Sequence, residues 1–135
     1  MKTVIILVGV SGSGKSTLAK SLVENWNGES AICSADDYFI KDRSYIFDAQ
    51  KLNHAHEHCH KKFMDSIVAK TSLIVVDNTN TKPSERDWYI EFAKRFEYYV
   101  VSLIVENIHG GQSIHNVPQQ TLDRQKNNIK ANIRL

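Results

Sequence analysis

Short apolar runs alternate with amphipathic segments over most of the chain. The runs are rich in β-branched residues, which is typical of strands that are buried on both faces of a parallel sheet. They cover residues 3–8, 30–35, 73–76 and 98–105. Because helical segments separate them, right-handed crossovers and helices on both faces of the sheet are expected. The pattern therefore predicts an α/β fold with a mostly parallel four-stranded sheet.

The segments between these runs have apolar residues at helical spacing. They cover residues 15–25, 48–70 and 83–96. The longest segment carries one apolar residue every three or four positions, at Leu52, Ala55, Cys59, Phe63 and Ile67.

The last part of the chain follows a different pattern. Residues 106–117 are polar and contain a glycine pair, and Pro118 can begin a last helix that carries Leu122, Ile129 and Ile133. No fifth strand is expected. Residues 106–135 are predicted to form a C-terminal lid.

The composition agrees with one ordinary globular domain, residues 1–135. Hydrophobic residues make up 41% and charged residues 24% of the 135 positions, which excludes collagen-like and low-complexity chains. Two cysteines without a convincing export signal exclude a disulfide framework and favour a cytoplasmic location. No window has the roughly 18 apolar residues of a membrane span, so no membrane partner is expected.

The net charge is only +2, and the basic excess lies in residues 106–135. Such an excess can attract phosphate or nucleic acid, although a solvated face is the simpler interpretation. The sequence leaves the oligomeric state open.

The sequence Gly-Val-Ser-Gly-Ser-Gly-Lys-Ser at positions 9–16 follows the first strand and opens the first helix. Such a loop directs backbone amides toward phosphate oxygens, while Lys15 reaches the β- and γ-phosphates and Ser16 can bind Mg²⁺. The motif predicts a single-domain P-loop NTPase fold that binds ATP or GTP. The guanine-reading tetrapeptide of GTPases is missing, which favours ATP, with Mg²⁺, as the cofactor. The predicted nucleotide-binding residues are Gly9, Ser11, Gly12, Ser13, Gly14, Lys15, Ser16 and Thr17.

Two adjacent carboxylates follow the second strand. Asp36 lies where the crevice of a parallel sheet opens, and it is the candidate for the base that accepts a proton from an alcohol acceptor. Asp37, the next residue of an extended segment, points to the other side. The alternative interpretation is that both residues cap the following turn.

A further carboxylate, Asp77, follows the third strand. P-loop enzymes place an acidic residue there to hold Mg²⁺, so Asp77 and Ser16 are the candidate metal-binding pair. Asp77, Asn78 and Thr79 are candidates for binding the substrate. Alternatively, Asp77 and the polar residues up to Asn80 form a turn at the strand end.

The segment His56-Glu57-His58-Cys59-His60 satisfies the His-Glu-x-x-His pattern of zinc proteases. A catalytic zinc needs a third protein ligand and an open cleft, whereas His56 projects beside the apolar stripe. The match is therefore interpreted as accidental.

Aromatic residues occur in two places that could contact nucleobases. Trp88, Phe92 and Phe96 recur every four residues, which favours core packing. Tyr38 and Phe39 follow the proposed base and are the better candidates for stacking.

Four segments carry a resemblance to a known family. They are Val-Gly-Val-Ser-Gly-Ser-Gly-Lys-Ser-Thr from residue 8, Ser34-Ala35-Asp36-Asp37-Tyr38-Phe39, Asp77-Asn78-Thr79-Asn80 and His115-Asn116-Val117-Pro118. With these segments the chain resembles the P-loop family of 5′-hydroxyl polynucleotide kinases. That family includes phage polynucleotide kinase and the related domain of the NEDD4-binding protein. The resemblance covers nearly the whole chain.

The resemblance implies that the γ-phosphate of ATP is transferred to the 5′-hydroxyl of a nucleic-acid end, DNA or RNA. Lys15 and Asp36 would be catalytic residues, with Asp36 as the general base. Two alternatives stay open. One is a small-molecule P-loop kinase, and the other is a non-catalytic ATP-binding module.

The chain departs from the family pattern at two positions. Phe39 stands where the phage enzyme has an arginine, and Arg43 is the candidate to supply the missing charge near the acceptor. The catalytic lid arginine of the family directly follows a leucine, where this chain has Asp123. Arg124 is expected to take that role after a shift of one residue.

Overall fold

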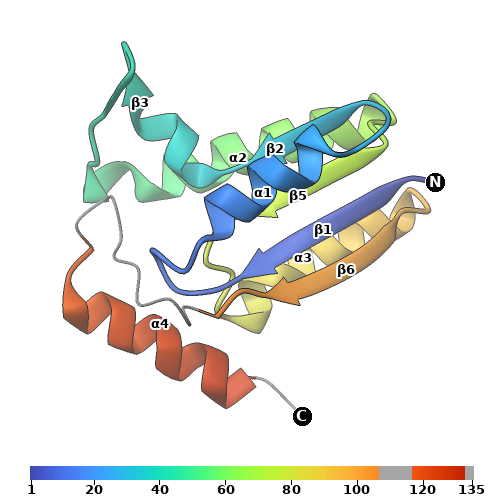
Figure 1. Cartoon of the computed structure of the whole chain (residues 1–135). Coiled ribbons are helices and arrows are strands. Elements are labelled where there is room, and N and C mark those ends of the chain that lie inside the picture. The colour runs from blue at the N-terminus through green and yellow to red at the C-terminus, as the bar shows by residue number, and fades with distance from the viewer. Residues whose placement is uncertain (107–116, 133–135) are drawn as a thin grey trace.

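A computed structural model describes residues 1–106 and 117–132 of the chain. Its centre is a sheet with the strand order β2-β5-β1-β6. The strands are β1 (Thr3–Val8), β2 (Ser30–Cys33), β5 (Leu73–Asp77) and β6 (Tyr99–Ile104). Each pair of neighbours is parallel, so all four carboxyl ends lie at one edge of the sheet (Figure 1). The predicted α/β fold with a parallel four-stranded sheet is confirmed.

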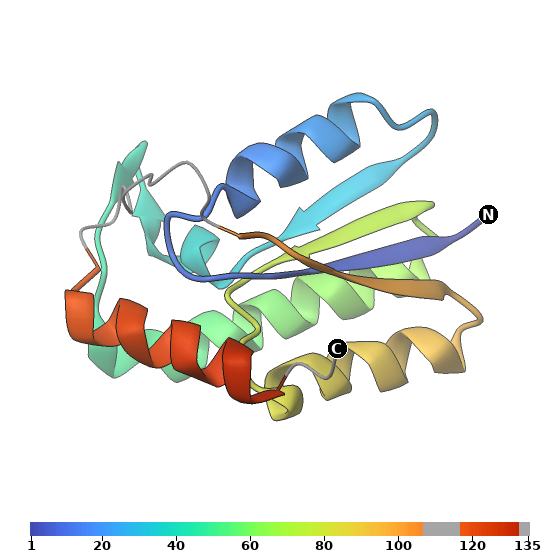
Figure 2. The same ribbon diagram turned by 60° about the horizontal axis from the view of Figure 1, so that its bottom comes forward.

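Helices cover both faces of this sheet. One face packs against α1 (Lys15–Glu24), and the other packs against α2 (Leu52–Val68) and α3 (Pro83–Arg95) (Figure 2). A fourth helix, α4 (Gln119–Asn132), lies beyond the carboxyl ends of the strands. The predicted connection at 107–116 and Ile133 lie outside the described residues. Within residues 1–106 and 117–132, no helix combines the length and the apolar character that crossing a membrane requires.

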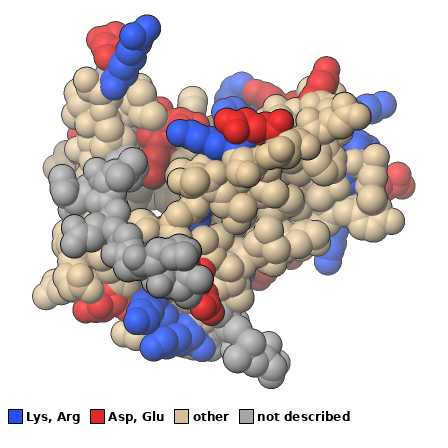
Figure 3. Space-filling model, in the orientation of Figure 1, with Lys and Arg blue, Asp and Glu red and all other residues tan. Residues whose placement is uncertain are grey.

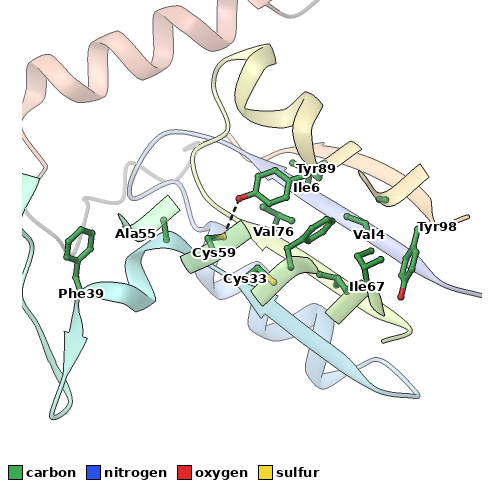
Figure 4. Close-up of a cluster of buried hydrophobic side chains, with 14 residues drawn as sticks. Val4, Ile6, Cys33, Phe39, Ala55, Cys59, Ile67, Val76, Tyr89 and Tyr98 are labelled. Atoms are coloured by element: carbon green, nitrogen blue, oxygen red, sulfur yellow. Dashed lines mark hydrogen bonds between the residues drawn. The ribbon is translucent and has the colours of Figure 1, made fainter. Parts of the chain in front are cut away.

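Alternate strand residues enter two separate cores. The core against α2 and α3 holds Val4, Ile6, Ile74 and Val76 (Figure 4). The core against α1 holds Leu7, Leu73 and Val75. Because both faces of the two central strands are covered, residues 4–8 and 73–76 are all apolar, which explains these continuous runs in the sequence.

The predicted stripe of α2 forms the centre of the larger core. Its buried members are Ala55, Cys59, Phe63 and Ile67. Leu52, the first residue of the helix, is instead 42% exposed. Cys59 accepts a hydrogen bond from the hydroxyl group of Tyr89 in α3 at 3.3 Å, which joins the two helices (Figure 4). Cys59 and Cys33 are both free and buried.

The buried face of α3 differs by one position from the predicted aromatic stripe. Tyr89 and Ala93 are its buried residues. Trp88 and Phe92 are half-buried and pack against the same core, so the prediction of core packing holds for them. It is wrong for Phe96, which is 41% exposed because the helix has already ended one residue earlier.

The chain between β2 and α2 forms four short elements that the sequence pattern did not predict. They are the 3₁₀ helix η1 (Ala35–Phe39), β3 (Ile40–Lys41), β4 (Ser44–Tyr45) and the 3₁₀ helix η2 (Ala49–Lys51). Strands β3 and β4 form an antiparallel hairpin that projects from the body of the molecule (Figure 1). Its turn places Asp42 at φ 49° and Arg43 at φ 66°.

The expectation that Phe39 stacks on a base is wrong. Phe39 is only 3% exposed, because η1 turns its side chain into the core. Its ring lies 5.1 Å from the ring of Phe47 and 6.2 Å from that of Tyr45. Tyr38 is half-buried, with its ring 5.7 Å from the ring of His58.

Candidate active site

The glycine-rich loop joins β1 to α1 at the carboxyl edge of the sheet. Gly14 is the N-cap of α1 and has φ 102°, a left-handed conformation that favours glycine. A Cβ atom on Gly9 would lie 2.7 Å from Ser13 Oγ and equally close to a backbone oxygen, so a side chain does not fit there. The Gly9 amide donates to the carbonyl oxygen of Thr79 at 3.0 Å. The start of the loop is thereby attached to the segment that follows β5.

Lys15 keeps its ammonium group inside the loop. The side chain is buried, and its Nζ donates to the carbonyl oxygen of Val10 at 2.8 Å. Burial lowers the pKa of Lys15, while the carboxylates of Asp77 and Asp36 act in the opposite direction. The loop therefore has a positive charge at the place where a phosphate group would need one.

Ser16 and Asp77 form a pair beside this lysine. Ser16 Oγ donates to Asp77 Oδ2 at 2.8 Å. Asp77 ends β5 and is buried, and burial raises its pKa against the effects of the Ser16 hydrogen bond and of the Lys15 charge. A hydroxyl and a carboxylate oxygen side by side are hard ligands of the kind that hold Mg²⁺ in P-loop proteins. The residues present therefore fit this cation.

The loop also contains a polar atom that needs a partner. Within the residues that the structure describes, Ser13 Oγ is a buried side-chain oxygen without a hydrogen-bond partner. Such atoms are rare in folded proteins, because their desolvation is not compensated. A phosphate group on the loop would supply the missing hydrogen bond, so the loop fits a nucleotide.

Asp77→Asn is expected to raise the melting temperature of the protein near pH 7, measured without added nucleotide or Mg²⁺. Burial raises the pKa of Asp77 in the folded state, so the folded protein binds a proton at a higher pH than the unfolded chain does. Stability therefore falls as the pH rises between the unfolded and the folded pKa, and above both the ionised carboxylate costs stability. Asparagine removes this cost and keeps an oxygen that can accept from Ser16.

Melting curves between pH 3 and pH 8 test this prediction. The difference between the variant and the wild type should shrink as the pH is lowered through the folded pKa of Asp77. Asp87→Asn at an exposed position of α3 is the matched control and should leave the curve unchanged. A variant that melts below the wild type at every pH would contradict the argument.

Asp36 and Asp37 lie on η1 and face different partners. The side chain of Ser34 caps η1 by accepting from the Asp36 amide at 3.3 Å. Asp36 Oδ1 accepts a hydrogen bond from the Tyr45 hydroxyl at 3.2 Å, whereas Asp37 Oδ2 lies 4.0 Å from Lys62 Nζ. Burial, and then the charge of Asp36, raise the pKa of Tyr45 to about 12, so the hydroxyl keeps its proton at neutral pH.

The charge of Asp36 opposes the effect of burial on the pKa of Lys15, and the charges of Asp36 and Asp37 add to the effect of burial in raising the pKa of Asp77, so η1 brings negative charge toward the loop. In the space-filling view, acidic side chains gather in the hollow between the projecting hairpin and the body of the molecule (Figure 3). The prediction that an extended segment turns the two carboxylates to opposite sides is wrong in its premise, because both lie in the 3₁₀ helix η1, although they contact different partners.

The residues after Asp77 form hydrogen bonds that hold neighbouring segments of the site in place. Asn78 Oδ1 accepts from the Ala35 amide at 2.8 Å, so it holds the start of η1, which carries Asp36. Asn80 is buried at φ 51°, and its side-chain amide donates to the carbonyl oxygen of Leu7 at 2.8 Å. Arg86 in turn donates to the backbone oxygen of Asn80 at 2.8 Å. For Asn78 the structure thus shows a positioning contact, and substrate binding by Asn78 and Thr79 stays a prediction.

Three of the predicted site residues, Thr17, Arg43 and Arg124, have exposed side chains. Thr17 is exposed in the first turn of α1. Arg43 is exposed at the turn of the hairpin, and the hairpin residue that contacts Asp36 is Tyr45. Arg124 is exposed on α4, whereas the next residue, Gln125, contacts the loop. The catalytic role of Arg124 and the substrate contact of Arg43 remain predictions.

The four histidines of α2 differ in their surroundings. His54 and His58 are exposed, while His56 and His60 are half-buried. The His60 ring stacks on Trp88 with 3.9 Å between the ring centroids, and burial lowers the pKa of His60. Among the residues described, no three histidine, cysteine, aspartate or glutamate side chains are grouped as metal ligands. His60 is part of the packing between α2 and α3.

Sequence reasoning missed Tyr45, Asn80 and Gln125. Tyr45 depends on a hairpin whose turn sequence, Asp-Arg, lacks the glycine or asparagine that usually marks such a turn. Asn80 was recognised as polar, and its position after a buried strand could have suggested a structural role. Gln125 lies 114 positions from the residue that it contacts, and no local pattern signals that contact.

Comparisons with known proteins agree with this geometry. A family model described as "AAA domain" matches residues 4–131. NEDD4-binding protein 2 of Homo sapiens is 37% identical over 97 residues, or 72% of this chain. The chain spans only 5% of the length of that protein. These similarities confirm the resemblance that the sequence motifs indicated.

Solved structures share the fold at low sequence identity. A chain in the Pnkp1/Rnl/Hen1 RNA repair complex has a TM-score of 0.72 and 15% identity, with coverage of 96% of this chain and 44% of that chain. A variant of the APS kinase CysC of Mycobacterium tuberculosis has a TM-score of 0.55 and 14% identity, with coverage of 96% and 95%. The fold is therefore that of a P-loop kinase-like domain.

Proposed function

The chain belongs to the AAA domain family of P-loop proteins, and on this premise we propose that it is an ATP-dependent polynucleotide kinase. It transfers the γ-phosphate of ATP to the 5′-hydroxyl of a nucleic-acid end. The observation that carries the proposal is the convergence of Lys15, the Ser16–Asp77 pair and Asp36 at one edge of the sheet. Phosphoryl transfer requires this combination of a phosphate cradle, a cation site and a base.

Each residue has a separate role in this proposal. The loop amides and Lys15 bind the phosphates, while Ser16 and Asp77 hold Mg²⁺. The cation neutralises charge that develops on the phosphate oxygens. Asp36 accepts the proton of the acceptor hydroxyl as the new oxygen–phosphorus bond forms and the bond to ADP breaks. Tyr45 donates to one oxygen of Asp36 and so orients this carboxylate toward the acceptor.

Helix α4, the described helix of the predicted lid, would close over the nucleotide. Arg124 is the proposed lid cation that stabilises charge on the transferring phosphate. Its exposure on α4 leaves the guanidinium group free to turn toward the crevice when the acceptor arrives.

Aromatic side chains beside Asp36 favour a nucleotide over a smaller alcohol as the acceptor. Phe47 is 54% exposed, and its ring lies against Phe39 in the same cluster as Tyr45. An exposed ring at this position is suited to stacking on a nucleobase, which stabilises single strands without regard to sequence. Arg43, at the turn of the same hairpin, would contact the acceptor backbone.

Transfer of label from γ-labelled ATP to oligonucleotides tests the proposed function. DNA and RNA oligonucleotides with a 5′-hydroxyl should gain label in the presence of Mg²⁺, and the same oligonucleotides with a 5′-phosphate should not. Oligonucleotide binding should also weaken steeply with added salt, because a bound polynucleotide releases counterions. Label that appears only on small alcohols would support a small-molecule kinase, and nucleotide binding without any transfer would support a non-catalytic module.

A further inference from the structure

Helix α4 touches the phosphate-binding loop through a neutral side chain. The Ser11 amide donates to Gln125 Oε1 at 3.0 Å. Gln125 is half-buried, whereas Arg124 and Lys126 on either side of it are exposed. The basic side chains of α4 thus face solvent, and a carboxamide faces the loop.

The Ser11 amide belongs to the group of backbone donors that a phosphate would use. It lies between Gly9 and Gly14, in the first half of the loop, which directly follows β1. The neighbouring residue, Val10, accepts from Lys15 Nζ at 2.8 Å, so the ammonium group lies beside the first half of the loop. This lysine of the motif reaches the β- and γ-phosphates, and the first half of the loop, with Ser11, therefore faces the outer end of a triphosphate.

A phosphate oxygen that accepts from Ser11 must take the place of Gln125 Oε1. A carboxamide has an acceptor oxygen and a donor nitrogen on the same planar group. A change of the Gln125 rotamer withdraws the carboxamide from that place and turns its nitrogen toward the phosphate. Gln125 can therefore accept from the loop in one orientation and donate to a phosphate oxygen in the other.

We propose that Gln125 is the residue of α4 that recognises the terminal phosphate of the nucleotide. The proposal rests on the proposed function as far as the nucleotide is concerned, and it adds a specificity-determining residue at the same site. Gln125 donates to the γ-phosphate, and ADP, which has no γ-phosphate, lacks that hydrogen bond. The contact distinguishes ATP from ADP and keeps α4 over the loop while the triphosphate is bound.

The dissociation constants of a non-hydrolysable ATP analogue and of ADP, measured by calorimetry with Mg²⁺, test this proposal. Gln125→Ala should reduce the preference for the triphosphate over ADP about tenfold, because a hydrogen bond to a charged group is lost. The ratio of the two constants is the decisive quantity, since loss of the contact with Ser11 helps both nucleotides to bind. Asn127→Ala, the loss of an amide at an exposed position of the same helix, should leave the ratio unchanged.

Two further variants separate recognition from simple packing. Gln125→Glu can still accept from Ser11 but cannot donate, and it should reduce the ratio more than alanine does because its charge repels the phosphate. Gln125→Lys restores a donor and should restore the preference. An unchanged ratio in Gln125→Ala or Gln125→Glu would overturn the proposal, as would a reduced ratio in Arg124→Ala together with a normal one in Gln125→Ala.

These measurements contain no acceptor. A failure of the proposed kinase function would appear as missing label transfer to oligonucleotides, while the role of Gln125 would still be decided by the two dissociation constants. A failure of the Gln125 proposal would in turn leave the transfer experiment unaffected. Melting curves of each variant confirm that the compared proteins are folded.

Discussion

Asp36→Asn is expected to slow phosphoryl transfer to a 5′-hydroxyl by roughly 10²–10⁴-fold, the usual contribution of a general base. The asparagine side chain has nearly the same shape but cannot accept the proton of the attacking hydroxyl. Asp36 shares the crevice with Lys15 and Asp77, yet its direct hydrogen-bond donor is Tyr45 on the hairpin. ATP affinity should therefore stay close to that of the wild type. Single-turnover rates at saturating ATP and oligonucleotide measure the effect.

Asp37→Asn is the matched control for this experiment. The same chemical change is made one residue further along η1, where the carboxylate lies 4.0 Å from Lys62 Nζ. Transfer should remain within a few-fold of the wild-type rate, since surface ion pairs contribute little. Equal losses in the two variants, or a normal rate in Asp36→Asn, would remove Asp36 from the mechanism.

Phe63→Ala is expected to lower the free energy of unfolding by about 3–5 kcal/mol, the range for removing a buried phenyl group. Phe63 is fully buried in α2, and its ring lies 5.0 Å from the ring of Tyr89 and 5.9 Å from that of Trp88. It therefore joins α2 to α3 across one face of the sheet. The loss is a large part of the roughly 5–15 kcal/mol that stabilises a typical domain. Urea denaturation followed by circular dichroism measures it.

Phe96→Ala provides the comparison at the exposed end of the same group of aromatic rings. The Phe96 ring stacks on Phe92 with 5.2 Å between the centroids, but the side chain is 41% exposed. Its removal should cost less than about 1.5 kcal/mol, the upper end for an aromatic pair. If both variants lost the same stability, burial at the junction of α2 and α3 would not be the cause.

The parallel sheet was predictable because its buried strands appear in the sequence as continuous apolar runs. Residues 4–8 and 73–76 are continuously apolar since helices cover both faces, and the stripe of α2 follows directly from helical geometry. The hairpin was not predictable. Arg43 adopts positive φ although arginine does not favour it, and Phe39 and Tyr45 pack against each other at the two ends of the hairpin.

The candidate site, too, has a part that the sequence predicts and a part that it does not. The position of the loop from Gly9 to Ser16 between a strand and a helix was predictable from one motif. Among the contacts between distant segments, the pairing of Ser16 with Asp77 was predicted, but those made by Tyr45 and Gln125 were not. Arg43 and Arg124 were chosen for their charge, whereas the side chains that touch Asp36 and Ser11 are Tyr45 and Gln125. Only the folded structure brings these pairs together.

The contacts inside the loop have a thermodynamic consequence. Lys15 Nζ bonds to the carbonyl oxygen of Val10, and the Ser11 amide bonds to Gln125. An arriving phosphate exchanges these partners one for one and does not have to order a loose segment. Little conformational entropy is lost when the nucleotide associates, but the energy of the two broken bonds offsets part of what the phosphate contacts supply.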